Sequence, residues 1–366
     1  MKEKKINNPV VLVAPLDWGL GHATRCVPVI TRLLEEECRV IIAASGAGKL
    51  LLQKEFPDLV FLDPGGYRVQ YSRNGAGMPY KLFMQIPKIL SVVYTEHRWL
   101  NRIIKEYSVD AVISDNRFGL FSKNAFCIYI THQLKIKTGK RLTEWLARKM
   151  HYWFINKFNE CWVPDTDKEN SLAGELSHPK KLPSVPVKYM GPLSRFEKSS
   201  TEEKYDLAVI LSGPEPQRTI FEELILRDLG SVSGNIILVR GLPDSSPLKI
   251  SFPASVEIKN HLNSQELNQV ILRSRLIVSR SGYSTVMDLV KLQKRAVLVP
   301  TPGQTEQEYL AEYLSQKKIC CCTRQADFSL PAAVNAASGF PFAEVNIPQN
   351  GYKKVIENFV EGMRNT

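Results

Sequence analysis

The stretch Leu276-Ile-Val-Ser-Arg-Ser-Gly-Tyr-Ser-Thr-Val-Met-Asp288 indicates the class of fold. Its apolar start, Leu276–Val278, predicts a buried strand, and the small residues that follow predict a turn. A helix is then expected over 284–292, followed by a second buried strand at Ala296–Val299. A strand, a helix and another strand in this order form a βαβ unit, whose two strands are parallel.

The same alternation extends outward in both directions. The second half adds predicted strands at Leu207–Leu211, Ile236–Val239, Val256–Ile258 and Cys320–Cys322, with helices over 216–228, 264–273 and 306–316. The first half predicts strands at Val10–Leu16, Arg39–Ala44, Leu59–Leu62, Ala111–Ser114, Phe126–Ile130, Cys161–Val163 and Val187–Met190. Several of these are apolar on both faces, which is typical of strands buried in a parallel sheet.

The length of 366 residues fits two domains of ordinary size. Residues 197–204 are polar and lack apolar periodicity, so we interpret them as a linker. The expected division is a first domain over 1–195 and a second over 196–349, with an amphipathic helix in 350–366 that can pack back on the first domain. The predicted fold is therefore α/β, with two facing Rossmann-like domains, parallel sheets and a cleft between them.

Composition restricts the class of protein. Apolar residues make up 44% and charged residues 23% of the chain, which is typical of a globular protein. The sequence contains no run of about 18 apolar residues that would predict a membrane span. Its start shows no signal-peptide pattern. The seven cysteines show no zinc-binding spacing, and they fit a reducing compartment. We therefore expect a cytoplasmic protein.

The positive charge is concentrated in the first half. Residues 1–200 hold 30 Lys and Arg against 19 Asp and Glu, whereas residues 201–366 hold 18 of each kind. Such an asymmetry indicates an anionic partner of the first domain: a nucleic acid, a membrane surface or a phosphorylated substrate. The alternative is that the charge serves only solubility.

A glycine-containing loop follows the first predicted strand. Gly19 and Gly21 let the backbone approach a ligand closely, and the helix that begins near His22 directs free N–H groups at an anion. Thr24 occupies the third glycine position of the dinucleotide-binding fingerprint, so a nicotinamide cofactor is not expected. His22 is a candidate base or phosphate contact.

Two more loops of the first domain leave the same edge of the predicted sheet, where ligands of open α/β sheets bind. Asp115 ends one strand and His132 closely follows the next. We expect His22 and Asp115 to be catalytic. We expect the substrate that carries the reacting hydroxyl, the acceptor, to be contacted by Gly19, Gly21, Arg117 and His132. The alternative for Asp115 is a helix cap.

Two loops of the second domain are candidate binding sites for the donor substrate of a transfer reaction. The loop 279–288 is an anion site by geometry, and Asp288 lies within reach of a ribose diol. The loop 300–309 brings acidic and amide side chains that can bind sugar hydroxyls. The alternatives are an ordinary capped helix start and an ordinary acidic first turn. The candidate binding residues are Ser281, Gly282, Ser284, Thr285, Asp288, Gln304, Glu306, Gln307 and Glu308.

Together these two loops resemble the donor half of the MurG-like glycosyltransferases, which share the GT-B fold with monogalactosyldiacylglycerol synthases. Gly19-Leu-Gly-His22 resembles the first glycine-rich loop of that family, which also ends in histidine. Gly191-Pro-Leu-Ser-Arg195 resembles the family segment Gly-Asn-Pro-x-Arg before the linker. The resemblance spans most of the chain and implies the GT-B fold.

The resemblance also implies roles for individual residues. Asp288 matches the acidic residue that holds the donor ribose, and Gln307 the first of two glutamines at the donor sugar. The other matched residues are Ser212, Gly213 and Arg195 beside the diphosphate, and His261 and Leu262 at the uracil edge. The sequence departs from the family where Glu308 replaces the second glutamine and where Ser212–Pro216 replaces a more glycine-rich loop.

The function that the resemblance implies is inverting transfer of a sugar from a UDP-sugar to a hydroxyl acceptor. We expect neither an essential metal nor a cofactor. Apolar and basic residues alternate over 140–158 and 80–100, which fits a lipid-linked acceptor and peripheral contact with an anionic membrane at its inner face. The alternative for these segments is a core helix with a solvated basic face.

Two other functions remain open. A nucleotide-sugar 2-epimerase uses the same fold and donor loops without an acceptor. A nucleic-acid-binding protein would fit the basic first half, but no nucleic-acid-binding motif accompanies that charge, so no nucleic acid is expected as a partner.

Overall fold

The computed structural model describes residues 8–66, 86–242, 248, 252–348 and 350–365. Within this part, the chain divides into two compact units. Unit 1 holds the described residues up to Ser194 together with those from Ile347 onward, and unit 2 holds Arg195–Asn346. Unit 2 is therefore inserted between two segments of unit 1.

Unit 1 is built on a parallel sheet of seven strands in the order β3-β2-β1-β4-β5-β6-β7. The four central strands consist largely of apolar residues with no access to solvent, which explains their burial on both faces. The strands are β1 (Val10–Pro15), β2 (Arg39–Ala43), β3 (Val60–Leu62), β4 (Ala111–Asp115), β5 (Phe126–Ile130), β6 (Glu160–Val163) and β7 (Val187–Tyr189).

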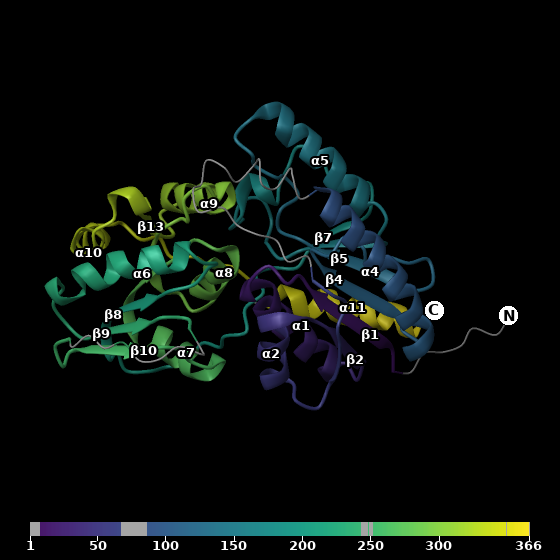
Figure 1. The fold of residues 1–366 in the computed structure, drawn as a ribbon, viewed down its shortest axis with the longest axis horizontal. Coiled ribbons are helices and arrows are strands. Elements are labelled where there is room, and N and C mark those ends of the chain that lie inside the picture. The colour runs from purple at the N-terminus through teal and green to yellow at the C-terminus, as the bar shows by residue number, and fades with distance from the viewer. Residues whose placement is uncertain (1–7, 67–85, 243–247, 249–251, 349, 366) are drawn as a thin grey trace. The chain divides into compact units, whose positions relative to one another are not determined.

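Helices cover both faces of this sheet, as Figure 1 shows. The apolar sides of α4 and α5 share one core with alternate residues of the strands, whereas α1 and α11 contact one another on the other side. The helices of unit 1 are α1 (Leu20–Glu35), α2 (Gly46–Glu55), α4 (Ile86–Tyr107), α5 (Arg141–Ile155) and α11 (Gly351–Arg364).

The last helix belongs to unit 1 although it follows unit 2 in the sequence. Phe359 of α11 packs on the rings of Phe126 in β5 and Trp162 in β6. Arg364 donates a hydrogen bond of 2.6 Å to the carbonyl oxygen of Glu36, just after α1. These contacts bury the apolar stripe of α11 against the sheet.

Unit 2 repeats the architecture with six parallel strands in the order β10-β9-β8-β11-β12-β13. The strands are β8 (Tyr205–Ile210), β9 (Ile236–Val239), β10 (Val256–Lys259), β11 (Ser274–Ser279), β12 (Arg295–Leu298) and β13 (Cys321–Cys322). The helices are α6 (Gln217–Asp228), α7 (Ser264–Leu272), α8 (Tyr283–Lys291), α9 (Thr305–Gln316) and α10 (Leu330–Ser338).

The α/β fold class predicted from the sequence is confirmed. The βαβ unit predicted around Leu276 is formed by β11, α8 and β12, and the two strands pair in parallel. Helix α10 was not predicted, because its sequence Leu-Pro-Ala-Ala-Val-Asn-Ala-Ala-Ser offers little contrast between an apolar and a polar face. No helix in the described ranges is both long and apolar enough to cross a bilayer.

Candidate functional site

The two predicted catalytic residues and one predicted acceptor contact meet at one edge of the sheet of unit 1. His22 lies in the first turn of α1, Asp115 is the last residue of β4, and His132 follows β5 by two residues. Asp115 pairs in register with Pro15 of β1 and with Ile130 of β5, so the three strands end side by side. The parallel sheet therefore brings together residues that are up to 110 positions apart in the chain.

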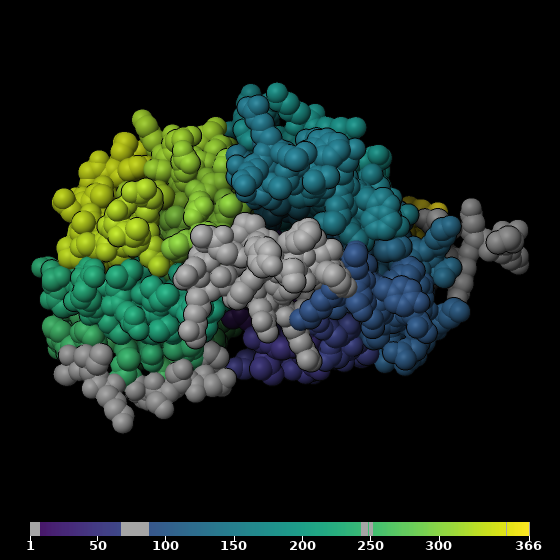
Figure 2. Space-filling model, turned by 45° about the horizontal axis from the view of Figure 1, so that its top comes forward, coloured from purple at the N-terminus to yellow at the C-terminus, as the bar shows by residue number. Residues whose placement is uncertain are grey.

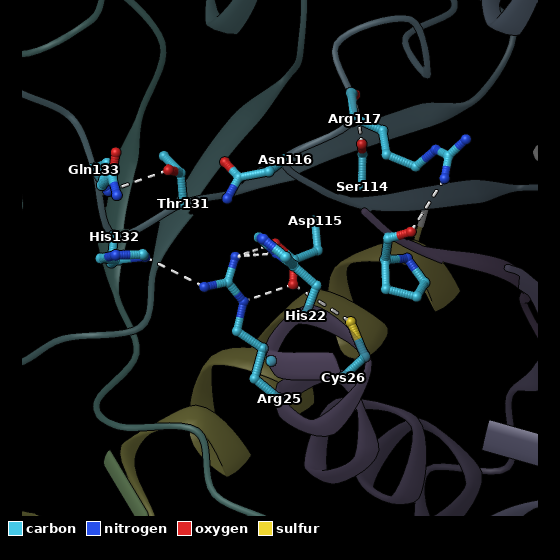
Figure 3. A network of polar contacts seen from close by, with 12 residues as sticks. His22, Arg25, Cys26, Ser114, Asp115, Asn116, Arg117, Thr131, His132 and Gln133 are labelled. Carbon is cyan, nitrogen blue, oxygen red and sulfur yellow. Dashed lines mark hydrogen bonds and ion pairs between the residues drawn. The ribbon is translucent and has the colours of Figure 1, made fainter. Parts of the chain in front are cut away.

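A buried arginine joins these three side chains. Arg25 Nε donates to Asp115 Oδ2 at 2.6 Å, and Arg25 Nη2 donates to Asp115 Oδ1, so the two groups form a two-pronged ion pair. Arg25 Nη1 lies 3.2 Å from His132 Nδ1. In Figure 3 the guanidinium of Arg25 lies between the carboxylate of Asp115 and the ring of His132.

His22 completes the cluster. Its Nδ1 lies 3.0 Å from Asp115 Oδ1 and 2.9 Å from Arg25 Nη2. This nitrogen can donate to the carboxylate when it carries the proton, or accept from the guanidinium when it does not. In the first case Nε2 carries the free lone pair and can accept a proton from a ligand. His22 also retains some solvent access, whereas Asp115 retains none.

The environment of the cluster shifts the pKa values of both Asp115 and His22. Burial opposes ionisation of Asp115, but the charges of Arg25 and His22 outweigh it and hold the pKa of the carboxyl well below its usual range. Burial lowers the pKa of His22; the charge of Asp115 acts against this, and the charge of Arg25 adds to it. The site therefore favours a carboxylate beside a neutral imidazole.

Arg25 was missed from the sequence. The available signal was its position three residues after His22, which places both side chains on the same side of α1. Arg25 is only 3% exposed, and a buried arginine requires a carboxylate partner. Asp115 was the carboxylate already predicted at this edge of the sheet.

In the structure, Arg117 forms internal hydrogen bonds instead of the predicted acceptor contact. Its side chain is fully buried, and Nε donates to Glu96 Oε1 of α4 at 2.7 Å. Nη1 and Nη2 donate to the carbonyl oxygens of Pro15 and Gly65, at 3.3 and 2.6 Å. Figure 3 shows Arg117 pointing away from the cluster around Asp115. Since it has no exposed surface, we assign it to holding the loops at the sheet edge together.

The glycines of the first loop shape the start of α1. Gly19 is the residue that precedes the helix, and its φ of 82° lies in the left-handed region that favours glycine. Open space surrounds the position that a Cβ would take there. The carbonyl oxygen of Gly21 accepts a hydrogen bond of 3.0 Å from Thr24 Oγ1.

The predicted donor residues lie at the carboxyl ends of the strands of unit 2. Ser212 and Gly213 follow β8 and are exposed, His261 and Leu262 follow β10, and Ser281 and Gly282 follow β11. Because all paired strands of this sheet are parallel, these loops leave the same edge. Gly282 directly precedes α8 and has open space at its Cβ position. Ser284, Thr285, Asp288 and Glu306 are partly exposed on α8 and α9.

Hydrogen bonds connect the two predicted donor loops. Ser281 Oγ donates to the carbonyl oxygen of Gln307 at 2.8 Å. Gln307 Oε1 accepts from the amide of Thr301 at 3.0 Å, and Gln307 Nε2 donates to Gln304 Oε1 at 2.5 Å. Glu308 Oε1 accepts from the amide of Gly303 at 2.9 Å. Gln307 and Glu308 therefore brace the loop that precedes α9.

Arg195 is positioned by α7. Its Nη1 donates to Ser264 Oγ at 2.7 Å, in the first turn of that helix. Asn263 and Glu266 form a capping box that fixes the same helix start, directly after His261 and Leu262. Within the described residues, no group of three or more His, Cys, Asp and Glu side chains is arranged to hold a metal ion.

Comparison with known proteins shows similarity to glycosyltransferases. Residues 225–338 match the glycosyltransferase family 28 C-terminal domain. The chain is 22% identical over 341 residues to an uncharacterized glycosyltransferase of Methanosarcina acetivorans, covering 86% of this chain and 85% of the relative. It is 23% identical over 243 residues to the UDP-N-acetylglucosamine–N-acetylmuramyl-(pentapeptide) pyrophosphoryl-undecaprenol N-acetylglucosamine transferase of Haemophilus ducreyi, covering 64% of each chain.

Two solved structures share the fold. The glycosyltransferase SnogD from Streptomyces nogalater superposes with a TM-score of 0.63 at 11% identity, covering 98% of this chain and 100% of that one. MurG of Acinetobacter baumannii superposes with a TM-score of 0.53 at 14% identity, covering 98% and 95%. The fold and the matched domain define a GT-B glycosyltransferase. More particularly, the chain is similar to MurG, and its residues 225–338 match the glycosyltransferase family 28 C-terminal domain.

Proposed function

We propose that the protein transfers a sugar from a nucleotide-sugar donor, a UDP-sugar, to a hydroxyl acceptor with inversion at the anomeric carbon. The observation that carries this proposal is the contact between His22 Nδ1 and Asp115 Oδ1, 3.0 Å long, at the ligand-binding edge of the sheet. A neutral imidazole oriented by a carboxylate is a general base, and transfer to a hydroxyl requires one.

In this mechanism Nδ1 of His22 donates to Asp115 and Nε2 accepts the proton of the acceptor hydroxyl. The acceptor oxygen forms a bond to the anomeric carbon while the bond from that carbon to the diphosphate oxygen breaks. The electron pair of the broken bond leaves with the nucleoside diphosphate. A single displacement of this kind inverts the configuration at the anomeric carbon.

Unit 2 supplies the donor site in this proposal. The leaving diphosphate takes up negative charge, which the N–H groups at the start of α8 and the guanidinium of Arg195 stabilise. Asp288 binds the ribose hydroxyls. The relative from Haemophilus ducreyi carries UDP-N-acetylglucosamine in its name, which supports uridine as the nucleoside of the donor. No cofactor and no essential metal form part of the proposal.

Product analysis tests the reaction. The protein is incubated with UDP-sugars, with and without a panel of hydroxyl acceptors, and the products are resolved by chromatography and NMR. We expect a glycosylated acceptor whose anomeric configuration is opposite to that of the donor. An epimerised UDP-sugar formed without acceptor would instead establish a 2-epimerase, and retained configuration would contradict the single displacement.

A lipid-linked acceptor at an anionic membrane forms a second part of the proposal. Helix α5 exposes a set of large apolar side chains on the surface of unit 1, where Figure 2 shows it in blue-green. The set comprises Leu142, Trp145, Leu146, Met150 and Trp153, with exposed fractions from 42% to 70%. Basic groups accompany it: Lys149 lies 3.9 Å from the ring centre of Trp145, and Lys157 lies 4.0 Å from that of Trp153. Exposed apolar and basic groups on one helix suit an anionic bilayer.

Helix α4 contributes similar side chains. Leu90 and Tyr94 are exposed, whereas residues 80–85 of the predicted amphipathic segment lie outside the described residues. Pelleting with liposomes tests the contact. We expect binding to vesicles containing phosphatidylglycerol, weaker binding to pure phosphatidylcholine, and loss of binding in the double variant Leu142→Glu, Trp153→Glu. Equal pelleting of that variant and the wild type would contradict the membrane contact.

A further inference from the structure

The guanidinium of Arg25 contacts each ionisable partner of His22 in the cluster. It forms the two-pronged ion pair with Asp115, lies 2.9 Å from His22 Nδ1 through Nη2, and lies 3.2 Å from His132 Nδ1 through Nη1. A guanidinium can only donate, so His132 presents an unprotonated Nδ1 to it. A side chain so placed affects the protonation of every neighbour.

The charges around His22 explain how Arg25 affects the protonation of His22. The ionisable groups that affect His22 are Arg25 from α1, Asp115 from β4 and His132 from the segment after β5, and Cys26 of α1 lies against Asp115. A buried carboxylate on its own stabilises the imidazolium form of a neighbouring histidine. An imidazolium has no lone pair and cannot act as a base. Arg25 is the permanent cation of this cluster, and it offsets the charge of Asp115.

We infer that Arg25 is a positioning residue that keeps Asp115 ionised and His22 uncharged, so that His22 remains a competent base at and below neutral pH. The role of His22 as base rests on the proposed function. The effect of Arg25 on the charge of His22 follows from the contacts alone and can be tested without any substrate.

Three observations support the inference. The Arg25 side chain is almost fully buried, so solvent screens its charge little. Both prongs reach the same carboxylate, which sets the orientation of Asp115 toward His22 Nδ1. His22 lies in the first turn of α1, where the positive end of the helix dipole also disfavours an imidazolium. Burial lowers the pKa of His22, and the charge of Arg25 adds to this effect.

The test is an NMR titration of histidine. The protein contains six histidines, so protein labelled with 15N-histidine gives a resolvable set of ring signals, and His22→Gln assigns the signal of His22. The variants are Arg25→Gln, which removes the charge, and Arg25→Lys, which keeps it. Arg32→Gln, two turns further along α1, is the matched control for loss of a charge from the same helix. Circular dichroism verifies that each variant is folded.

The wild type is expected to keep His22 uncharged down to a pH below 6.5. In Arg25→Gln the titration midpoint of the His22–Asp115 pair should rise by about one pH unit or more, whereas Arg25→Lys and Arg32→Gln should stay close to the wild type. An unchanged midpoint in folded Arg25→Gln overturns the inference. A wild-type midpoint above 6.5 overturns it as well, and that measurement needs no variant.

Activity separates this inference from the proposed function. If His22 is the base, the acid limb of the kcat/KM profile should move to higher pH in Arg25→Gln in parallel with the NMR midpoint, whereas a merely structural defect lowers the whole profile without moving it. If His22→Gln retains full activity, the base assignment fails. The NMR comparison of the wild type with Arg25→Gln still decides whether Arg25 controls the charge of His22.

Discussion

Arg117 Nε and Glu96 Oε1 lie 2.7 Å apart, and neither side chain has any surface exposed to solvent. Removing one partner of such a pair leaves an uncompensated buried charge. We therefore expect Arg117→Met to lower the free energy of unfolding by about 3–5 kcal/mol. Urea denaturation measures this. The double variant Arg117→Met, Glu96→Met removes both charges and should be more stable than the single variant; equal or lower stability would contradict the explanation.

Gly119 lies against the same glutamate, and its amide donates to Glu96 Oε2 at 3.2 Å. A Cβ at this position would come within 2.6 Å of Glu96 Cβ, a distance that real atoms do not tolerate. We expect Gly119→Ala to destabilise the protein by about 1–3 kcal/mol. Gly230→Ala is the matched control, because nothing lies within 4 Å of its Cβ position. Thermal unfolding of the two variants gives the comparison; similar melting temperatures would show that the loop at Gly119 adapts.

His151 of α5 makes stability depend on pH. Burial lowers the pKa of His151 from 6.5 to about 4, and its Nδ1 has no hydrogen-bond partner among the described residues. Between these two values the unfolded chain binds a proton that the folded chain does not. The contribution is therefore complete above pH 6.5 and lost as the pH falls toward 4, a difference of about 3 kcal/mol.

His151→Phe should remove this part of the pH dependence. Urea denaturation of the wild type and the variant at several pH values from 4 to 7.5 measures it. The stability of the wild type relative to the variant should fall by up to about 3 kcal/mol as the pH falls from 6.5 to 4. Parallel curves over the whole range would show that His151 does not remain neutral in the folded protein.

His22→Gln tests the proposed base. The amide can still form a hydrogen bond but cannot accept the proton of the acceptor, so we expect kcat to fall about 10²–10⁴-fold. UDP binding should be unchanged, because the donor residues belong to unit 2. Steady-state kinetics and calorimetric titration with UDP measure the two quantities. His178→Gln, which removes a histidine that stacks on Tyr189, is the control for loss of an imidazole elsewhere in unit 1.

Asp288→Ala tests the donor site. UDP at about 100 times its dissociation constant should stabilise the wild type by about 2.7 kcal/mol, which is seen as a higher melting temperature. The stabilisation should be largely lost in Asp288→Ala and kept in Asp327→Ala, which removes an exposed carboxylate of the same unit. If UDP stabilises both variants equally, Asp288 does not hold the ribose.

The sequence predicted the strands well because each central strand is a short apolar run, and parallel strands are apolar on both faces. It also placed His22, Asp115 and His132 at one edge, since the carboxyl ends of parallel strands meet there. The sequence did not predict individual side-chain contacts between residues that lie far apart in the chain. Nothing in the sequence pairs Arg117 with Glu96 on a helix that precedes it, so an internal ion pair was interpreted as an acceptor contact.

The position of Arg25 illustrates the same limit. An arginine three residues after His22 is consistent with an exposed helix face, and the hydrophobic pattern of α1 does not require its burial. Only the packing of α1 beside β4 shows that Asp115 accepts both prongs of its guanidinium. Short elements were also difficult to predict: α10 has nine residues, and its alanines do not distinguish a buried face from an exposed one.

The place of α11 in unit 1 bears on how the chain acquires its structure during synthesis. The helix that packs on Phe126 and Trp162 leaves the ribosome only after the whole of unit 2 has been made. Until then the sheet of unit 1 exposes the apolar surface that α11 later covers, and unit 2 can fold while unit 1 is still incomplete. The N-terminal half of this protein is therefore the last to be finished.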